Sequence, residues 1–351
     1  MRYALGEIVL VVIGILIALQ INTWSQSQKE LNKEIQLYSE IYDDLKREYF
    51  RIEEIIKDVN KYQKLHFHVY NESKGKAQFD PDQYYNYLHW QQRYQMFFSE
   101  KYALILPNLY NDDLQDRLKY YLNQERITNT AVSEWNDFKL HTLRPFFSEH
   151  GINNSKGFFS TETPVFSTLT SMEFIDHAQL KKMYGSMELD QLLYDLRFKT
   201  TWMHQNLVWL KDSNKRFEGI IKEELILHNT TDIITKWERL DEKIKILTEA
   251  ENLYDAEEYL KSAKKYVEAS EYGGLHSDDR YNAACSYALA ENIDSAFCHL
   301  FIIVNGTSSR SYNDWMTRDS DLDILHDDKR WSELTLILEA NIKNRDAGIE
   351  E

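Results

Sequence analysis

The 351-residue chain is poor in the residues that interrupt helices. It contains 11 glycines and 4 prolines, whereas average usage would place about 25 glycines and about 18 prolines in a chain of this length. Glycine and proline mark the turns of β-sandwiches and dominate disordered and collagen-like chains. Their scarcity beside 43% hydrophobic residues argues against those classes and favours an all-α protein.

Positive charge and cysteine are also scarce. Lys and Arg total 41 against 57 Asp and Glu, so the formal net charge is −16. Because a nucleic-acid-binding face must neutralise phosphates with positive charge, we expect no nucleic-acid partner. Cys285 and Cys298 are the only cysteines, which excludes a disulfide framework and a four-cysteine zinc site. A single bridge between them and two separate buried thiols both stay open.

A long apolar run opens the chain. Residues 8–19 read IVLVVIGILIAL, and residues 3–24 span about one bilayer thickness, with Tyr3 and Trp24 at the two ends. Small residues that would mark a signal-peptide cleavage site do not follow the run. The pattern predicts an uncleaved transmembrane anchor over residues 1–24, in contact with the lipid bilayer. Gly14 and Ala18 have the spacing that lets two membrane helices approach closely, which would give a homo-oligomer.

The sequence GEIVLVVIGILIALQINTW, residues 6–24, resembles the opening of a family of uncharacterised bacterial single-pass membrane proteins. In that family a basic leader precedes the anchor, whereas this chain begins almost inside the motif, which leaves open a start further upstream. The resemblance implies the inner membrane, with the N-terminus in the cytoplasm and the bulk of the chain in the periplasm. The charges around the run do not themselves decide the orientation. The resemblance implies no activity and no catalytic residue.

Helical periodicity continues after the anchor. Apolar residues alternate in steps of three and four over residues 31–59 without glycine or proline, which predicts a helix over about residues 24–68. Ile41, Ile55 and Tyr62 widen the apolar stripe beyond a two-stranded seam. The stripe therefore favours a helix packed in a bundle of its own chain over a homodimeric coiled coil.

Further helices complete a predicted bundle domain over residues 25–230. An Asp-Pro pair opens a predicted helix over residues 80–98, and leucines and aromatics at helical spacing predict a second long helix over residues 187–227. Between them, residues 151–171 hold the densest Gly, Ser, Thr and Pro usage, which is typical of a long loop. Shorter helices are expected over residues 111–123 and 128–143.

Aromatic residues crowd the predicted helix over residues 80–98. Rings on nearly every face of a helix are either buried in the centre of a bundle or presented outward, where they suit recognition of a peptide, a glycan or another amphipathic ligand. Both interpretations stay open from the sequence. The candidate recognition cluster consists of Tyr84, Tyr85, Tyr87, Trp90, Tyr94, Phe97 and Phe98.

The last third of the chain, residues 231–351, shows an internal repeat. Within DRYNAACSYALAENIDSAFCHLFIIV, residues 279–304, small, aromatic, small and large side chains alternate, and part of the pattern also occurs upstream. The segment resembles tetratricopeptide repeats, in which small residues let antiparallel helices touch. A generic pair of helical hairpins is the alternative. The residues expected to define the packing are Ala256, Leu260, Ala263, Ala284, Tyr287, Ala296 and Leu300.

Motifs that carry chemistry are missing from the sequence. It has no Gly-rich phosphate loop, no nucleophile elbow and no two-histidine zinc helix. Asp319, Asp321 and Asp323 resemble the start of a calcium loop, but Ile324 and Arg330 stand where such a loop needs Gly and Glu, so we interpret the aspartates as a solvated turn. We therefore expect no catalytic residue, no cofactor and no metal.

Two functional hypotheses follow. The first is a membrane-anchored interaction or scaffold protein, whose helical bundle and tetratricopeptide-like module bind a partner protein. The alternative is an extracytoplasmic ligand-sensing or catalytic helical domain, with an aromatic-lined pocket under the loop over residues 151–171. The first needs no active site, whereas the second needs a ring-lined cavity with convergent Arg, Asp or His groups.

Overall fold

The structure is a computed structural model, and it describes residues 2–80, 84–106, 109, 111–160, 162, 173–272, 278–306 and 316–346, with side chains between residues 13 and 345. These residues form helices. One isolated antiparallel bridge joins Asn153 and Ile175, and the described part of the chain contains no strand. The all-α prediction is therefore confirmed. The chain divides into two compact units, residues 1–231 and 232–351.

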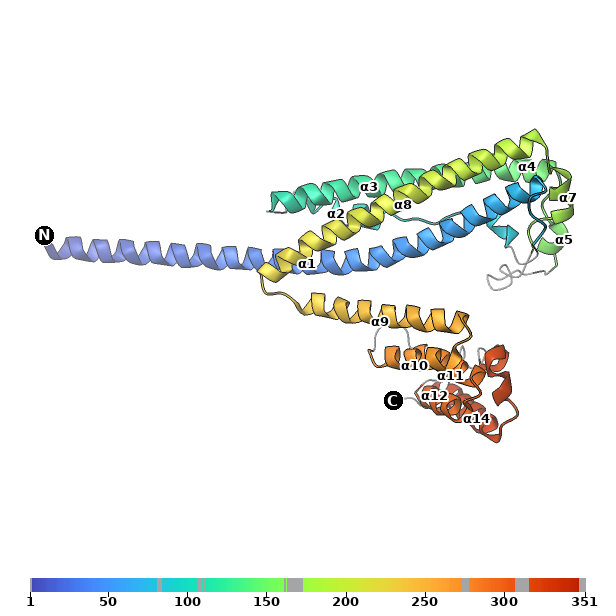
Figure 1. The fold of residues 1–351 in the computed structure, drawn as a ribbon. Coiled ribbons are helices and arrows are strands. Elements are labelled where there is room, and N and C mark those ends of the chain that lie inside the picture. The colour runs from blue at the N-terminus through green and yellow to red at the C-terminus, as the bar shows by residue number, and fades with distance from the viewer. Residues whose placement is uncertain are drawn as a thin grey trace. The chain divides into compact units, whose positions relative to one another are not determined.

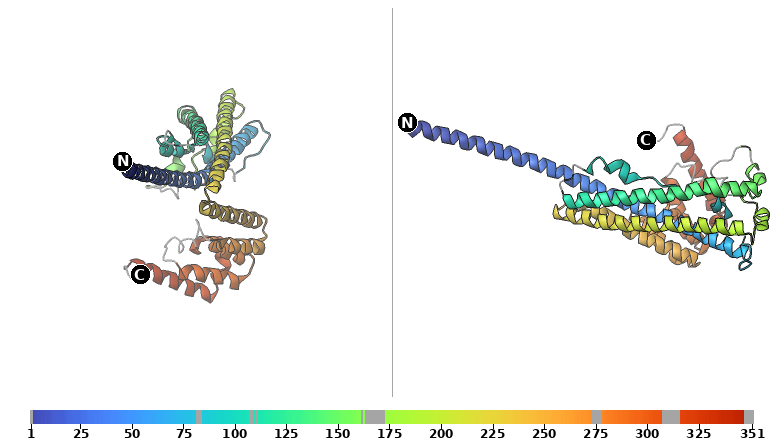
Figure 2. Two further views of the ribbon diagram at one scale, coloured as in Figure 1. Left: turned by 90° about the vertical axis from the view of Figure 1, so that its left-hand side faces the viewer. Right: turned by 90° about the horizontal axis from the view of Figure 1, so that it is seen from above.

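Three long helices lie side by side in the first unit (Figures 1 and 2). They are α1 (Arg2–Ser73), α3 (Asp112–Phe138) and α8 (Met187–Leu227). The α8 helix packs along both of the others, so α1 is a bundle helix of its own chain, as the widened stripe predicts. Both long helices expected from the periodicity are present, and α1 extends beyond the predicted bounds at each end.

The N-terminal part of α1 runs on beyond α3 and α8 (Figure 1). Gly14 meets no atom of another segment within 4 Å, and Ala18 is exposed. No helix in the part of the chain with described side chains is both long and apolar enough to cross a membrane. Residues 1–12 of the predicted anchor lie outside that part. The exposed apolar side chains beyond them are Ile13, Ile15, Leu16, Ile17, Leu19, Ile21 and Trp24.

Short elements connect the long helices of the first unit. They are the 3-10 turn η1 (Tyr85–Leu88), α2 (Phe97–Tyr102), the π-helical turn η3 (Lys139–Leu143), α4 (Arg144–Glu149), α5 (Ser155–Phe158) and α7 (His177–Lys182). The helices expected over residues 111–123 and 128–143 form one continuous helix, α3, that passes directly into η3. Within the loop expected over residues 151–171, α5 is the described helix, and residues 161 and 163–171 lie outside the described residues.

The prediction of a helix over residues 80–98 is wrong. Its described part is helical only in η1 and at the start of α2, and residues 90–96 have no regular structure. Side chains of α3 bind the backbone here: Asn136 accepts a hydrogen bond from the Gln92 amide at 3.0 Å, and Glu125 accepts from the amides of Phe98 and Ser99 at the start of α2, at 2.9 and 2.7 Å. Such bonds replace the i→i−4 bonds that a helix would form.

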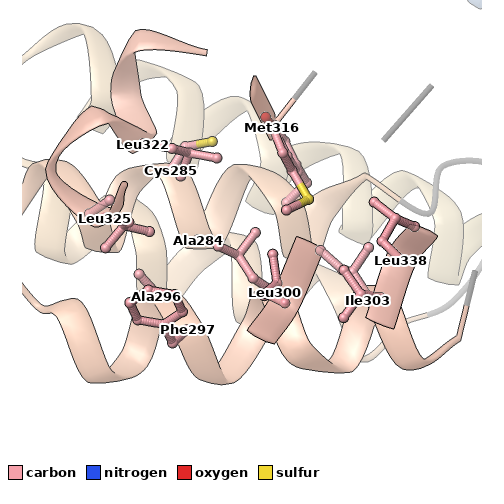
Figure 3. Packing of buried hydrophobic residues seen from close by; sticks show 14 residues of the cluster. Ala284, Cys285, Ala296, Phe297, Leu300, Ile303, Met316, Leu322, Leu325 and Leu338 are labelled. Atoms are coloured by element: carbon pink, nitrogen blue, oxygen red, sulfur yellow. The ribbon is translucent and has the colours of Figure 1, made fainter. Parts of the chain in front are cut away.

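Helices of the second unit follow one another as packed neighbours. They are α9 (Asp232–Asp255), α10 (Tyr259–Ser270), α11 (Asp279–Leu289) and α12 (Ile293–Asn305), followed by η4 (Ser320–Leu325) and α14 (Lys329–Asp346). A buried ion pair, Lys243 to Asp279 at 2.6 Å, joins α9 to α11. Figure 3 shows Ala284 and Leu300 within one apolar cluster that also includes Leu325 and Leu338.

The two cysteines of the second unit are free thiols. Cys285 is buried in α11, whereas Cys298 on α12 is exposed. The structure therefore contains no bridge between them, and the expectation of a buried thiol is right for Cys285 and wrong for Cys298.

Candidate functional site

A cleft of about 1090 Å³ opens in the first unit. Its walls come from α1, residues 89–93, the junction of α3 with η3 and α4, and the segment that carries α5. Arg93 and Arg144 are its cationic lining residues, and Asp58 is its carboxylate. We call it the aromatic cleft, because its lining includes Tyr62, His89, Trp90, Phe158, Phe159 and Phe174.

Two side chains at the end of α3 hold one wall of the aromatic cleft in place. Asn136 accepts from the Gln92 amide at 3.0 Å and donates to the Gln92 carbonyl at 2.9 Å. Lys139 is fully buried, and its Nζ donates to the carbonyls of Tyr87 and Trp90. Backbone groups of an irregular segment must find partners when they are buried, and these two residues supply them. They thereby fix the position of Trp90.

The π-helical turn η3 places Arg144 at the cleft. A π turn adds a residue to the helical repeat, so it changes the direction of the side chains that follow, and such turns often occur at functional sites. Arg144 follows η3 directly, lines the cleft and donates to the His89 carbonyl at 3.2 Å. The turn thus brings a guanidinium to the segment that α3 already holds.

The cleft wall is electropositive. Burial, together with the charges of Arg144 and Lys139, lowers the pKa of His89 to about 4, so the imidazole is neutral at pH 7. Nε2 of His89 and Nε of Arg144 are buried without a hydrogen-bond partner. Asp58 forms an ion pair with Lys61 at 2.9 Å, which neutralises the lining carboxylate.

The α5 side of the cleft depends on a close approach at Gly157. Asn154 caps α5 by accepting from the Gly157 amide at 2.9 Å. A Cβ at Gly157 would lie 2.6 Å from the carbonyl oxygen of Glu173, the residue before Phe174. Glycine therefore lets α5, with Phe158 and Phe159, lie against the backbone of Glu173 and Phe174, which completes the wall.

We expect Gly157→Ala to loosen this wall. The methyl group must displace backbone atoms, and overpacking of this kind costs about 1–3 kcal/mol, so hydrogen exchange of residues 154–160 should become roughly tenfold faster. Gly219→Ala is the matched control, because Gly219 lies in α8 with no atom within 4 Å. That change should stabilise the helix by about 0.5–1 kcal/mol. Unchanged exchange in Gly157→Ala would contradict the packing argument.

Only one residue of the predicted aromatic cluster, Trp90, lines the cleft. Tyr85 donates to Glu72 at 3.0 Å, and Phe98 is fully buried, with its ring centroid 4.9 Å from that of Tyr121. The half-buried remainder consists of Tyr84, Tyr87, Tyr94 and Phe97. The cluster is therefore divided between core and cleft rather than gathered on one helix.

The predicted packing residues of the second unit fall into two groups. Tyr287 is half-buried and stacks on His299 with 5.6 Å between ring centroids. The prediction is wrong for Ala256, which is exposed in the turn after α9, and for Leu260, which is 45% exposed. The buried face of α10 instead contains Ser262, Ala263, Tyr266 and Ala269. The fully buried predicted residues are Ala263, Ala284, Ala296 and Leu300.

A polar corner of the second unit brings Cys285, Asp319 and Asp321 within 4.8 Å of one another. Tyr281 donates to Asp319 at 2.9 Å, and Tyr254 donates to Asp321 at 2.6 Å. Burial raises the pKa of the Cys285 thiol, and the two carboxylates raise it further. Both carboxylates accept hydrogen bonds from tyrosine hydroxyls of the same unit. The corner ties α9, α11 and η4 together, so a solvated turn is the wrong description of Asp319 and Asp321.

The chain is similar to one family over part of its length. Residues 7–82 match a family of unknown function (DUF6090), which agrees with the resemblance of residues 6–24 to an uncharacterised family. The match ends before Trp90, Arg144 and the α5 segment, so it does not reach most of the aromatic cleft. No curated protein and no solved structure matches the chain.

Proposed function

We propose that this chain is a membrane-anchored protein whose first unit binds an organic ligand in the aromatic cleft, without catalysing a reaction. The supporting observation is a single cavity wall that combines aromatic rings with buried polar atoms that lack partners, on His89 and Arg144. Binding sites for small molecules are clefts of this kind, mostly apolar with a few convergent polar groups. The volume of about 1090 Å³ would accommodate several rings.

The anchor is the second part of the proposal. Residues 8–19 contain ten Ile, Leu and Val residues, which favour insertion by about 3–6 kcal/mol on the scale of membrane insertion. The described apolar side chains of residues 13–24 contact no other part of the fold closely enough to be buried. By the resemblance of residues 6–24, we place the N-terminus in the cytoplasm of a bacterium and the two units in the periplasm. Gly14 and Ala18 would then face a second copy within the inner membrane.

A second candidate function is binding of a partner protein by the second unit. The stacking of α9 to α12, with fully buried Ala263, Ala284 and Ala296 in their helices, supports a tetratricopeptide-like module. Exposed Leu260 and Ile302 would offer apolar contacts to such a partner. The two candidates concern different units and are tested separately.

Ligand binding is tested with four water-soluble probes and a pair of matched variants. The probes are phenylacetate, phenylacetamide, trigalacturonate and its methyl ester, titrated against the full chain in detergent. At least one probe should bind, and Ser155→Trp should weaken that binding at least tenfold, because Ser155 lines the cleft and is exposed. Ser332→Trp introduces the same side chain at an exposed site of α14 and should leave binding unchanged. Absence of binding by all four probes, or equal binding by Ser155→Trp, would contradict the proposal.

A further inference from the structure

We propose that the aromatic cleft binds an organic anion, with a carboxylate of the ligand at Arg144 and a ring of the ligand against Phe158 and Phe159. This inference rests on the proposed binding function of the cleft and adds the chemical class of the ligand. Aromatic acids and acidic sugars share that chemistry, because both join a carboxylate to a ring face.

Arg144 carries the anion part of the argument. Its guanidinium has five donors, of which one is paired with the His89 carbonyl at 3.2 Å, while Nε is buried without a partner. Arg144 forms no salt bridge with any carboxylate among the described residues. A half-buried cation without a counter-charge is costly, and a planar guanidinium matches a carboxylate in geometry as well as charge. A bound anion would supply the missing counter-charge.

The surroundings of Arg144 reinforce its charge. Arg93 lines the same cleft. Asp58 is the one carboxylate among the described lining residues, and it is paired with Lys61. This electropositive patch belongs to a chain of net charge −16. Positive potential that persists at one cleft of an acidic protein favours anions there and excludes cations.

Phe158 and Phe159 carry the ring part of the argument. Their side chains are 43% and 81% exposed at the cleft, and their centroids lie 5.7 Å apart in an edge-to-face arrangement. The ring of Phe158 also lies 5.9 Å from that of Phe174. Exposed rings next to a cation suit a ligand that is flat on one side and charged at one end.

The acid and neutral members of each probe pair test the inference, because the amide or ester keeps the ring and removes the negative charge of the carboxylate. In the full chain at low ionic strength, at least one acid should bind tenfold or more tightly than its amide or ester, and added salt should reduce that preference. Arg144→Gln should remove the preference while the neutral probe binds as before, which also shows that the cleft is intact. Arg144→Lys should retain part of it, since it keeps the charge and loses the planar fork.

A second cleft variant, one control variant and two contrary outcomes complete the test. Arg93→Gln, at an exposed position of the cleft, should reduce the preference without affecting the fold. Arg197→Gln, at an exposed position of α8 that does not line the cleft, should change nothing. Equal binding of acid and neutral probes, unaffected by Arg144→Gln but lost in Ser155→Trp, would overturn the anion inference and leave the binding function standing. Failure of every probe would overturn both. Preference within the phenylacetate pair or the trigalacturonate pair identifies which source of the anion the cleft takes.

Discussion

Glu125→Ala should release the segment over residues 90–102 from the bundle. One carboxylate oxygen of Glu125 accepts from the Phe98 amide at 2.9 Å, and the other accepts from the amide and the hydroxyl of Ser99, at 2.7 and 2.5 Å. The carboxylate is fully buried. Each buried amide left without an acceptor costs about 1–3 kcal/mol. A total of about 3 kcal/mol would raise hydrogen exchange of the two amides by about a hundredfold.

Two further variants separate the causes of that effect. Glu125→Gln keeps the volume but offers one acceptor oxygen where two are used, so we expect an intermediate increase in exchange. Glu134→Ala, at an exposed position of the same helix, should change the exchange of residues 97–102 very little. Hydrogen exchange followed by mass spectrometry on the full chain measures all three variants. Equal exchange in Glu125→Ala and the original chain would show that apolar packing alone, including that of Phe98, holds the segment.

The same long-range bonds explain what the sequence could and could not predict in the first unit. The long helices are predictable because their signal is local: apolar residues recur at helical spacing, and α8 has the predicted bounds. The segment over residues 90–99 has helical composition and an Asp-Pro cap before it, but side chains of Glu125, Asn136 and Lys139 bind its backbone at Phe98, Gln92 and Trp90. Those partners are distant in sequence, and tertiary hydrogen bonds overcome a weak local preference.

The cleft was predictable only in outline. Crowded aromatics and a Gly- and Ser-rich loop correctly indicate rings and an irregular wall, and Trp90 belongs to both the prediction and the cleft. Arg144 reaches the cleft through the π turn at residues 139–143, for which the sequence contains no recognisable signal. Phe158 and Phe159 lie in the predicted loop, but nothing local distinguishes rings that line a cleft from rings in a core.

The error at Ala256 and Leu260 has a conformational cause. A helix through both residues would place them in phase with Ala263, yet α9 ends at Asp255 and α10 begins at Tyr259. Between them, Glu257 has a φ of 59°, a left-handed conformation that is uncommon for residues other than glycine. Because glycine is absent from this turn, the sequence does not mark the break, and the predicted phase of the upstream repeat is wrong.

Lys139→Met should destabilise both the first unit and the wall of the aromatic cleft. The substitution keeps most of the buried volume but removes the donor to the Tyr87 and Trp90 carbonyls. It also removes the Nζ atom that lies 4.0 Å from the centroid of the Trp135 ring. Two buried carbonyls without donors cost about 2–4 kcal/mol. Lys139→Met also removes the free-energy cost of burying a group that is charged in the unfolded chain, and this gain opposes the cost of the lost hydrogen bonds. The gain is smaller at pH 9 than at pH 7, so the net loss of stability should be clearest at pH 9.

The pH dependence distinguishes these opposing effects. Burial lowers the pKa of Lys139 well below its ordinary value, and Arg144 lowers it further. The unfolded chain therefore binds a proton on Lys139 more readily than the folded chain does. As a result, the stability of the original chain rises with pH up to the unfolded pKa of about 10.4. Lys139→Met should lose that part of the slope between about pH 7.5 and pH 9.5, a window chosen below the titration of the tyrosines. Lys119→Met, at an exposed site of α3, should keep the slope. If the stability of Lys139→Met, measured by urea unfolding at each pH, has the same pH dependence as that of the original chain, the burial of Lys139 does not cause that dependence.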